Sequence, residues 1–245
     1  MLSTYKTILS KKIQLTSDVY LYHFDLLEPK EITFKAGQYM ILLIPLEKNS
    51  HTTLMRPHSS CIYGEMARRL YSIVSPDTIK NSIEFIIEII PGGLASSYLY
   101  NLKVKDEVVF QGPAGMFGLK ENDRPKIFLA TGTGIAPVRS MLESYQLPVS
   151  SYSLFWGLKM YKDIYLFDEL KKFNPKICLS REQNLDMIPK TDRKYFGLGH
   201  VDQCLEKQLT NFDFYLCGRR EIIESLRQFL IKKDVLRENI YFEKF

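Results

Sequence analysis

Arg69-Leu70-Tyr71-Ser72 places a cation, an aromatic ring and a hydroxyl within one short segment. In a strand, residues two apart share a face, so the Arg69 guanidinium and the Tyr71 ring would point the same way. A guanidinium binds phosphate oxygens through its planar fork, and an aromatic ring packs well on another flat ring. The segment could therefore hold a nucleotide cofactor that carries a flat ring. An ordinary strand with an exposed Arg and a half-buried Tyr would contain the same residues.

A glycine-rich turn follows at Gly92-Gly93-Leu94-Ala95-Ser96, where a helix is expected to begin. Glycine allows close backbone approach, and the start of a helix offers free N–H groups and a positive dipole end. Such an end suits a pyrophosphate, and we assign Gly92, Gly93, Leu94 and Ser96 to it. The alternative is a plain helix start with a serine near its N-terminus, which is common.

A second turn, Gly132-Thr133-Gly134-Ile135-Ala136-Pro137, lies between a predicted strand and a predicted helix. That context is the one a dinucleotide-binding turn requires. The pattern is not a full G-x-G-x-x-G, because Pro137 stands at its last position. We expect Thr133, Gly134 and Pro137 to contact a dinucleotide.

Two further pairs end predicted strands of the second half, Ser180-Arg181 and Cys217-Gly218. The carboxyl ends of parallel strands are where ligands bind in such sheets. Ser180 and Arg181 could hold a ribose 2′-phosphate, since Arg suits phosphate geometry. The alternatives are a polar strand end for the first pair and, for Cys217, a small buried hydrophobe.

In this order, the motifs resemble those of the ferredoxin–NADP reductase family, from about residue 4 to the last residue. The resemblance implies that Tyr71 packs on the flavin ring and that Ser72 hydrogen-bonds near the flavin N5. It places Cys217 beside the nicotinamide, while Gly218 lets that ring approach. The chain ends in Tyr241-Phe242-Glu243-Lys244-Phe245. By resemblance, the terminal aromatic residue covers the flavin face that the nicotinamide must occupy. The catalytic candidates are Ser72, Cys217, Glu243 and Phe245.

The elements that would position these residues change character along the chain. The first half contains short strands rich in aromatic and β-branched residues, which predicts a small antiparallel β-barrel, and the resemblance implies that this barrel binds FAD. The second half alternates strands and helices, which predicts a doubly wound parallel sheet, and the resemblance implies that this domain binds NAD(P). We expect the domains to be residues 1–122 and 123–245, with the flavin between them. A helix is expected over 201–209, and 47–68 forms a long irregular region of unassigned role.

Composition agrees with a globular protein, at 45% hydrophobic and 25% charged residues with a net charge of +5. The longest apolar stretch is too short to span a bilayer, so we expect no membrane insertion. Four scattered cysteines indicate neither a disulfide framework nor a metal site and favour a reducing cytoplasm. No spacing typical of a plant-type iron–sulfur module occurs, so such a centre would sit on a partner. We expect no bound metal and no nucleic acid partner.

The resemblance implies hydride transfer between NADPH and FAD, and electron transfer to or from ferredoxin or flavodoxin. The mild basic surplus would favour such acidic redox proteins. NADP is expected at Arg181, with NAD as the alternative. Two other functions have the same motifs: an NAD(P)H-dependent flavin or quinone reductase, and an electron-transfer subunit of a larger redox complex. The natural acceptor, the direction of electron flow and the oligomeric state stay open.

Overall fold

The computed structural model describes residues 2–46, 62–63, 66–205 and 209–244. The chain divides into two compact units, Met1–Gly118 and Leu119–Phe245. Each unit has its own sheet and its own hydrophobic core. The boundary expected from the sequence, after residue 122, lies just inside the second unit.

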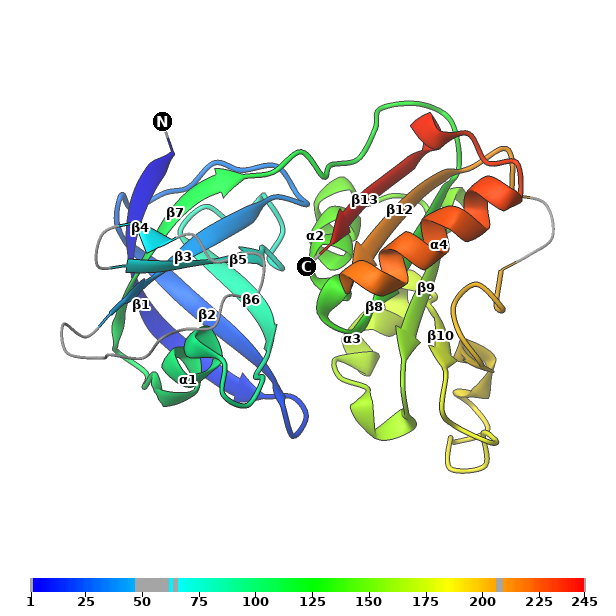
Figure 1. The fold of residues 1–245 in the computed structure, drawn as a ribbon, viewed down its shortest axis with the longest axis horizontal. Helices are drawn as coiled ribbons and strands as arrows, with labels where there is room; N and C mark the ends of the chain where they lie inside the picture. The colour runs from blue at the N-terminus through cyan, green and yellow to red at the C-terminus, as the bar shows by residue number, and fades with distance from the viewer. Residues whose placement is uncertain (1, 47–61, 64–65, 206–208, 245) are drawn as a thin grey trace. The chain divides into compact units, whose positions relative to one another are not determined.

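Unit 1 is built on an antiparallel sheet that curls into a half-barrel (Figure 1). Within the described part of the chain its strand order is β4-β5-β3-β7-β1-β2-β6. The strands are β1 (Ser3–Gln14), β2 (Val19–Glu28), β3 (Tyr39–Pro45), β4 (Ile62–Tyr63), β5 (Met66–Ser72), β6 (Ser82–Glu88) and β7 (Glu107–Ala114). A single helix, α1 (Leu94–Asn101), is described in this unit. The predicted antiparallel β domain is confirmed.

The core of unit 1 forms because its strands alternate inward and outward side chains. In β2, Phe24 is fully buried, whereas its neighbours His23 and Asp25 are half-buried. Phe110 completes the centre: its ring lies 5.1 Å from the rings of both Phe24 and Phe85. Such aromatic pairs add to the gain from apolar burial.

Helix α1 is fixed to this sheet at its C-terminal end. Leu99 is fully buried in the core. Lys12 on β1 donates its ammonium hydrogens to the carbonyl oxygens of Leu99, Tyr100 and Leu102, at 3.3, 2.6 and 3.2 Å. These are the carbonyls that a helix end leaves without partners, and a cation there also suits the negative end of the dipole. The opposite end of α1 begins at the Gly92–Gly93 turn.

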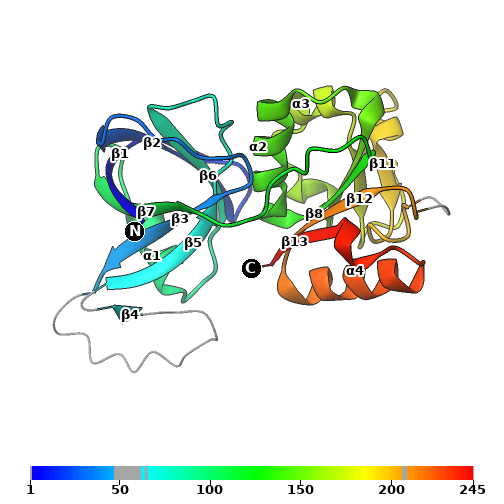
Figure 2. The same ribbon diagram turned by 90° about the horizontal axis from the view of Figure 1, so that it is seen from above.

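Unit 2 contains a parallel sheet with helices on both faces. The order of its described strands is β11-β10-β9-β8-β12-β13. Figure 2 shows α2 and α3 on one face and α4 on the other. The elements are β8 (Lys126–Thr131), α2 (Ile135–Tyr145), β9 (Tyr152–Leu158), α3 (Phe167–Leu170), β10 (Lys176–Leu179), β11 (Phe196–Leu198), β12 (Asp213–Gly218), α4 (Arg220–Lys232) and β13 (Ile240–Lys244). The predicted doubly wound domain is confirmed.

The order of this sheet contains a topological switch point. The chain moves from β8 outward through β9, β10 and β11, then crosses back to place β12 on the other side of β8. Connections on the two sides of β8 therefore leave in opposite directions. In open α/β sheets the crevice at the carboxyl ends of the two strands at such a point is where ligands bind. Here those strands are β8 and β12.

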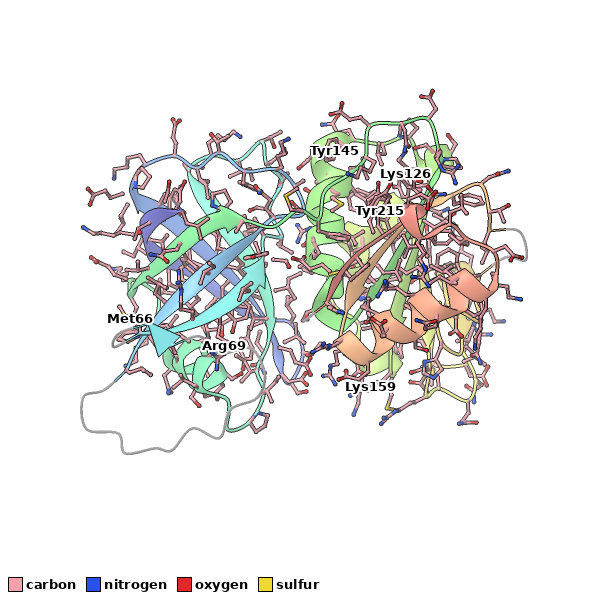
Figure 3. All side chains as sticks on the ribbon, turned by 45° about the horizontal axis from the view of Figure 1, so that its top comes forward. Met66, Arg69, Lys126, Tyr145, Lys159 and Tyr215 are labelled. Carbon is pink, nitrogen blue, oxygen red and sulfur yellow. The ribbon has the colours of Figure 1, made fainter. Side chains whose placement is uncertain are left out.

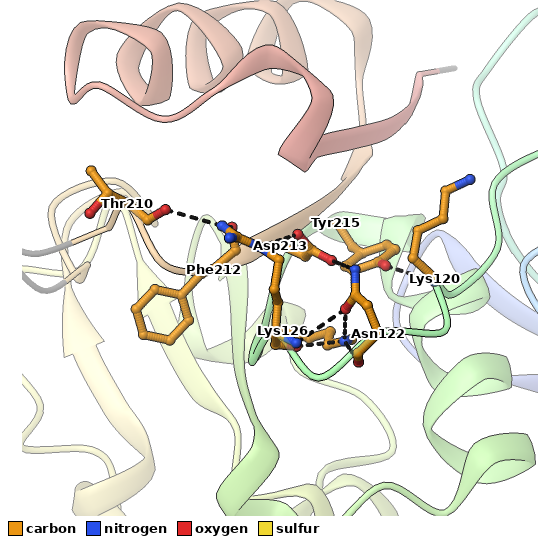
Figure 4. A network of polar contacts seen from close by, with 8 residues as sticks. Lys120, Asn122, Lys126, Thr210, Phe212, Asp213 and Tyr215 are labelled. Atoms are coloured by element: carbon orange, nitrogen blue, oxygen red, sulfur yellow. Dashed lines mark hydrogen bonds and ion pairs between the residues drawn. The ribbon is translucent and has the colours of Figure 1, made fainter.

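The opposite edge of β8 and β12 is closed by a buried polar network (Figure 4). Asp213 is fully buried and accepts hydrogen bonds from Asn122 Nδ2 at 2.8 Å and from Arg124 Nε at 2.9 Å. Lys126 Nζ donates to the backbone carbonyl oxygen of Asn122 at 2.8 Å. Tyr215 accepts a hydrogen bond from the Lys120 N–H at 2.9 Å. The network fixes the segment that enters β8, because each buried charge has a partner.

The structure differs from the sequence prediction in several elements. Strand β1 was not predicted, and β5 begins earlier than expected, inside the region taken as irregular. Residues 201–205 form turns rather than the start of a helix, so that prediction is wrong for the described residues. Between β9 and β10, the helical structure is limited to the four residues of α3 and a short 3-10 turn.

Candidate functional site

Strand β5 of unit 1 carries the first group of predicted residues, and Figure 3 labels Arg69 on it. Arg69 Nη1 donates to the Arg68 carbonyl oxygen at 2.8 Å, which holds the guanidinium beside the strand. Tyr71, on the same face, is half-buried and meets the Phe85 ring edge-on at 6.3 Å. Burial raises the pKa of Tyr71 to about 12, against the opposing effect of the Arg69 charge. Tyr71 is therefore a neutral, positioned ring.

Ser72 ends the same strand and is buried, at 6% exposure. It stands opposite Tyr39 in the antiparallel pairing of β5 with β3. The pairing with β3 therefore fixes the backbone that carries this hydroxyl.

The glycine-rich turn before α1 has the conformation that glycine permits. Gly92 has φ +76°, in the left-handed region, and a Cβ there would meet no atom within 4 Å. Gly93 stands at the N-cap of α1 in an extended conformation, without a side-chain cap. Ser96 Oγ accepts a hydrogen bond from the Ile90 N–H at 2.9 Å, which closes the turn. Leu94 packs against the core. The first N–H groups of α1 therefore follow a turn that is open at Gly92.

The Gly132–Gly134 turn leaves the carboxyl end of β8, at the switch point. Gly132 has φ +53°, and a Cβ there would again meet nothing within 4 Å. Gly134 has an ordinary φ of −61° but is tightly packed. A Cβ on it would lie 2.5 Å from the Cys217 carbonyl carbon and 2.9 Å from the Gly218 nitrogen. Glycine at 134 therefore allows the start of α2 to lie directly against the end of β12.

Thr133 and Pro137 complete this second turn. Thr133 is half-buried at its centre. Pro137 lies in the first turn of α2 and is buried. Proline is tolerated there because the first N–H groups of a helix have no intrahelical partner. The predicted strand–turn–helix context is thus present.

Cys217 and Gly218 end β12 beside that turn. Cys217 is fully buried, and burial, with a smaller contribution from the Glu243 charge, raises the pKa of its thiol well above the usual value. The parallel pairing of β12 with β13 puts Glu243 next to Cys217. Gly218 has φ +152°, and a Cβ there would overlap the Thr131 hydroxyl. Thr131 Oγ1 is itself buried and has no hydrogen-bond partner among the described residues.

Ser180 and Arg181 follow β10 at the same edge of the sheet. Ser180 Oγ donates to the Leu158 carbonyl oxygen at 3.2 Å. Arg181 is exposed, and its backbone N–H donates to the Lys159 carbonyl oxygen at 2.9 Å. The Glu182 carboxylate accepts the Tyr161 N–H at 2.9 Å. These bonds tie the loop after β9 to the loop after β10 and leave the Arg181 side chain at the surface.

Two domain families match the chain. An oxidoreductase FAD-binding domain matches residues 6–118, and an oxidoreductase NAD-binding domain matches residues 128–228. The toluate 1,2-dioxygenase electron transfer component of Pseudomonas putida is 30% identical over 247 residues, covering 98% of this chain and 67% of that protein. The chain belongs to the ferredoxin–NADP reductase family.

The anthranilate 1,2-dioxygenase electron transfer component of Acinetobacter baylyi is 28% identical over 223 residues, covering 88% of this chain and 59% of that protein. Among solved structures, a ferredoxin NADP+ reductase from Neisseria gonorrhoeae with bound FAD and NADP has a TM-score of 0.74 and 18% identity, covering 99% of this chain and 98% of that one. The structural likeness supports the fold. The chain spans about two thirds or less of the length of these curated relatives.

As a member of the ferredoxin–NADP reductase family, the chain is an oxidoreductase with an FAD-binding and an NAD-binding domain. Its own geometry fits these cofactors. Each unit contains an open glycine turn before a helix whose N-cap has no side-chain cap, which leaves backbone donors for a pyrophosphate. The buried Thr131 hydroxyl, without a partner among the described residues, adds a polar group at the second turn. When bound, FAD supplies the chemistry that joins a two-electron hydride to single-electron transfer.

The structure brings some of the predicted site residues together. Thr133, Gly134, Cys217, Gly218 and Glu243 gather at the carboxyl ends of β8, β12 and β13. The flavin-binding candidates are all in unit 1. Phe245 lies outside the described residues, so its role stays a prediction.

Sequence reasoning missed two residues that hold the second turn. The carbonyl oxygen of Gly132 accepts hydrogen bonds from Trp156 Nε1 at 2.9 Å and from the Tyr165 hydroxyl at 3.0 Å. Thr131 was also not named, although it precedes the turn. No spacing in the sequence connects Trp156 or Tyr165 to Gly132, because they come from later elements of the sheet. For Thr131, its place at the end of a buried strand was the available signal.

Among the described residues, no helix is both long and apolar enough to cross a membrane. Within the same residues, no cluster of three or more His, Cys, Asp or Glu side chains could hold a metal ion.

Proposed function

We propose that this chain transfers hydride between NADPH and FAD and passes electrons to or from a ferredoxin or flavodoxin. The observation that carries the proposal is the glycine turn at the switch point, where Gly134 and Gly218 allow two backbones to meet. Such a turn followed by a helix N-terminus binds a pyrophosphate. Membership of the family supports the flavin in the other domain.

The residues of unit 1 would bind and orient the flavin. Arg69 would pair with the pyrophosphate, together with the N–H groups that follow Gly92 and Gly93. The neutral Tyr71 ring would pack against the flavin ring. The Ser72 hydroxyl would hydrogen-bond near the flavin N5, where hydride arrives.

The residues of unit 2 would position the nicotinamide. Thr133, Gly134 and Pro137 would border the pyrophosphate, while Gly218 would leave space for the ring. The Cys217 thiol stays protonated because its pKa lies well above the usual value, so it would act as a compact neutral neighbour. Glu243, half-buried beside Cys217, would be the group that accepts and relays protons.

The proposed choice of NADP over NAD rests on Arg181. Arg181 is exposed just beyond the carboxyl end of β10, and Ser180, whose hydroxyl donates to the Leu158 carbonyl oxygen, precedes it in the chain. A guanidinium fork matches a phosphate group in shape and charge. NADH lacks the 2′-phosphate, so it would gain nothing from this contact.

A second function is favoured by the relatives. Several are electron transfer components of dioxygenases or reductase components of monooxygenases. We propose as the alternative that this chain is such a subunit, which gives its electrons to an oxygenase system. To test the proposed acceptors, we would measure the rates at which the NADPH-reduced protein reduces purified ferredoxin, purified flavodoxin and free FMN. A rate with free FMN equal to that with both proteins would support a flavin reductase instead. The proposed setting is the cytoplasm.

The flavin site is tested by Arg69→Ala, with Arg69→Lys as a matched variant that keeps the charge. Charge-assisted hydrogen bonds contribute roughly 1.5–3 kcal/mol each. Arg69→Ala should therefore bind FAD about ten- to a hundredfold more weakly, and Arg69→Lys should lose less. Released flavin per protein and calorimetric titration with FAD measure the effect. Wild-type affinity in Arg69→Ala would place the pyrophosphate elsewhere, and a wild-type protein that binds no flavin would overturn the function.

Nucleotide choice is tested by Arg181→Ala. We expect its affinity for NADPH to fall about tenfold, because the exposed ion pair is partly screened by water, while its affinity for NADH stays unchanged. Lys233→Ala is the matched control, since Lys233 is an exposed cation that follows α4 at the opposite edge of the sheet. An equal loss for both nucleotides would mean that Arg181 contacts a group they share.

A further inference from the structure

We infer that Trp156 and Tyr165 are positioning residues for the dinucleotide, because together they set the orientation of the Gly132–Thr133 peptide. The inference rests on the proposed binding of a nicotinamide dinucleotide at this turn. Trp156 lies on β9 and is fully buried, and Tyr165, which precedes α3, is 4% exposed. Their rings meet edge-on with centroids 4.9 Å apart.

Both side chains donate to one backbone atom. Trp156 Nε1 lies 2.9 Å and the Tyr165 hydroxyl 3.0 Å from the Gly132 carbonyl oxygen. The Ile135 N–H at the start of α2 is directed to the same oxygen. A carbonyl oxygen has two lone pairs, so three donors saturate it. Rotating this peptide would break the hydrogen bonds from Trp156 and Tyr165, and the fully buried Trp156 Nε1 would lose its acceptor.

The consequence follows from the geometry of a trans peptide. The carbonyl oxygen of one residue and the N–H of the next point in opposite directions across the same plane. Since the Gly132 carbonyl is held toward Trp156 and Tyr165, the Thr133 N–H is held away from them. That N–H belongs to the turn expected to bind a pyrophosphate. Gly132 at φ +53° is free to adopt other backbone conformations, so the two side chains supply a restraint that the glycine lacks.

The rigidity of the pair makes this restraint effective. Trp156 lies in the centre of the sheet, paired in register with Ala130 of β8 and Ile177 of β10. It cannot follow a displacement of the turn without disturbing three strands. Binding groups held by a rigid scaffold need less ordering when the ligand arrives, which increases affinity.

The affinities for NADH and NADPH should respond differently to loss of Trp156 or Tyr165 and to loss of Arg181. The pyrophosphate is common to NADH and NADPH, so loss of the restraint should weaken both to the same extent. Loss of Arg181 should weaken NADPH alone. Both side chains donate to the backbone of the turn rather than to the residues assigned to the reacting ring, so turnover at saturating nucleotide should be retained.

The test is Tyr165→Phe in the FAD-loaded protein, which removes one hydroxyl and keeps the ring. We expect the Kd of NADP+, measured by calorimetry, and the KM of NADPH and of NADH to rise about three- to tenfold, the effect of one neutral hydrogen bond. The kcat should stay unchanged. Tyr152→Phe is the matched control. Tyr152 is also a buried tyrosine, but it lies at the first residue of β9 and packs on Phe128.

A second variant, Trp156→Phe, tests the other donor, and the thermal transition of each variant shows whether it folds. If the Tyr165→Phe variant binds both nucleotides with wild-type affinity, the inference is overturned. An equal loss in Tyr152→Phe would also overturn it, because the effect would then be general to buried tyrosines. A wild-type protein that binds neither nucleotide would overturn the proposed function itself, so the two failures are distinguishable.

Discussion

Replacing Gly134 with alanine should be far more harmful than replacing Gly132, although Gly132 has the unusual backbone angle. Gly132 has φ +53°, which costs an alanine about 1–2 kcal/mol, but its Cβ would enter open space. Gly134 has a φ of −61°, which an alanine adopts without strain. Its Cβ, however, would lie within 2.9 Å of backbone atoms of both Cys217 and Gly218. Backbone atoms cannot rotate away as a side chain can, so α2 and β12 must separate to admit the alanine.

The magnitude follows from the kind of contact. Overpacking a well-packed core costs typically 1–3 kcal/mol, and contacts with backbone place Gly134→Ala at about 3 kcal/mol or above. For a domain of this size that corresponds to a loss of about 10 °C in the melting temperature. Gly132→Ala should lower the melting temperature by about a third to two thirds of that amount. Both variants are measured by circular dichroism melting and by calorimetric titration with NADP+.

The expected order also holds for binding. Gly134→Ala moves the start of α2 away from Cys217 and should abolish measurable NADP+ binding. Gly132→Ala keeps that approach and should bind with a modest loss. If Gly134→Ala is as stable as Gly132→Ala and binds NADP+ equally well, the close approach of the α2 and β12 backbones does not require glycine at position 134.

Two pH-dependent predictions follow from titratable side chains away from the site. The pKa of His23 is raised mainly by its hydrogen bond to Glu84, at 2.9 Å. The stabilisation from this bond is therefore present below the pKa of His23 in the unfolded chain, about 6.5, and it disappears as the pH rises through the pKa of His23 in the folded protein. Urea unfolding should therefore show wild type more stable than His23→Gln at about pH 5.5, with the difference vanishing at about pH 8.5; a constant difference would contradict the reasoning. The neighbouring Cys178 side chain is the main cause that lowers the pKa of Cys204 to about 7, so alkylation of Cys204 by iodoacetamide should rise through that pH, whereas buried Cys178 stays unreactive. In Cys178→Ala the midpoint for Cys204 should move toward about 8.5, and peptide mapping by mass spectrometry would reveal an unchanged midpoint as a failure.

The sequence was sufficient for elements whose local pattern and tertiary role agree. Strand β8 is a continuous apolar run between polar flanks, and a glycine turn and an amphipathic helix follow it. Each of these local preferences points to the same strand–turn–helix unit. The motif at Arg69–Ser72 was likewise found because strand alternation fixes which side chains share a face.

Other elements depend on contacts that a local pattern does not contain. Strand β1 alternates imperfectly, since lysines and threonines interrupt it, and it forms because it pairs with both β2 and β7. The helix expected over 201–209 was wrong for its described residues because an apolar spacing typical of a helix also suits turns that bury single side chains. Val201 is such a residue, buried in the core of unit 2.

The charge states at the end of β12 divide the tasks between two neighbouring residues. Cys217 is fully buried, and both its burial and the Glu243 charge disfavour a thiolate, so the sulfur stays neutral at physiological pH. A neutral thiol cannot act there as a nucleophile or as a base. In the proposed reaction, hydride transfer would place no new charge on the protein, so a neutral, compact side chain would suit a position beside the nicotinamide. We therefore assign proton movement in the proposed reaction to Glu243, which is half-buried on the adjacent strand and so keeps access to water.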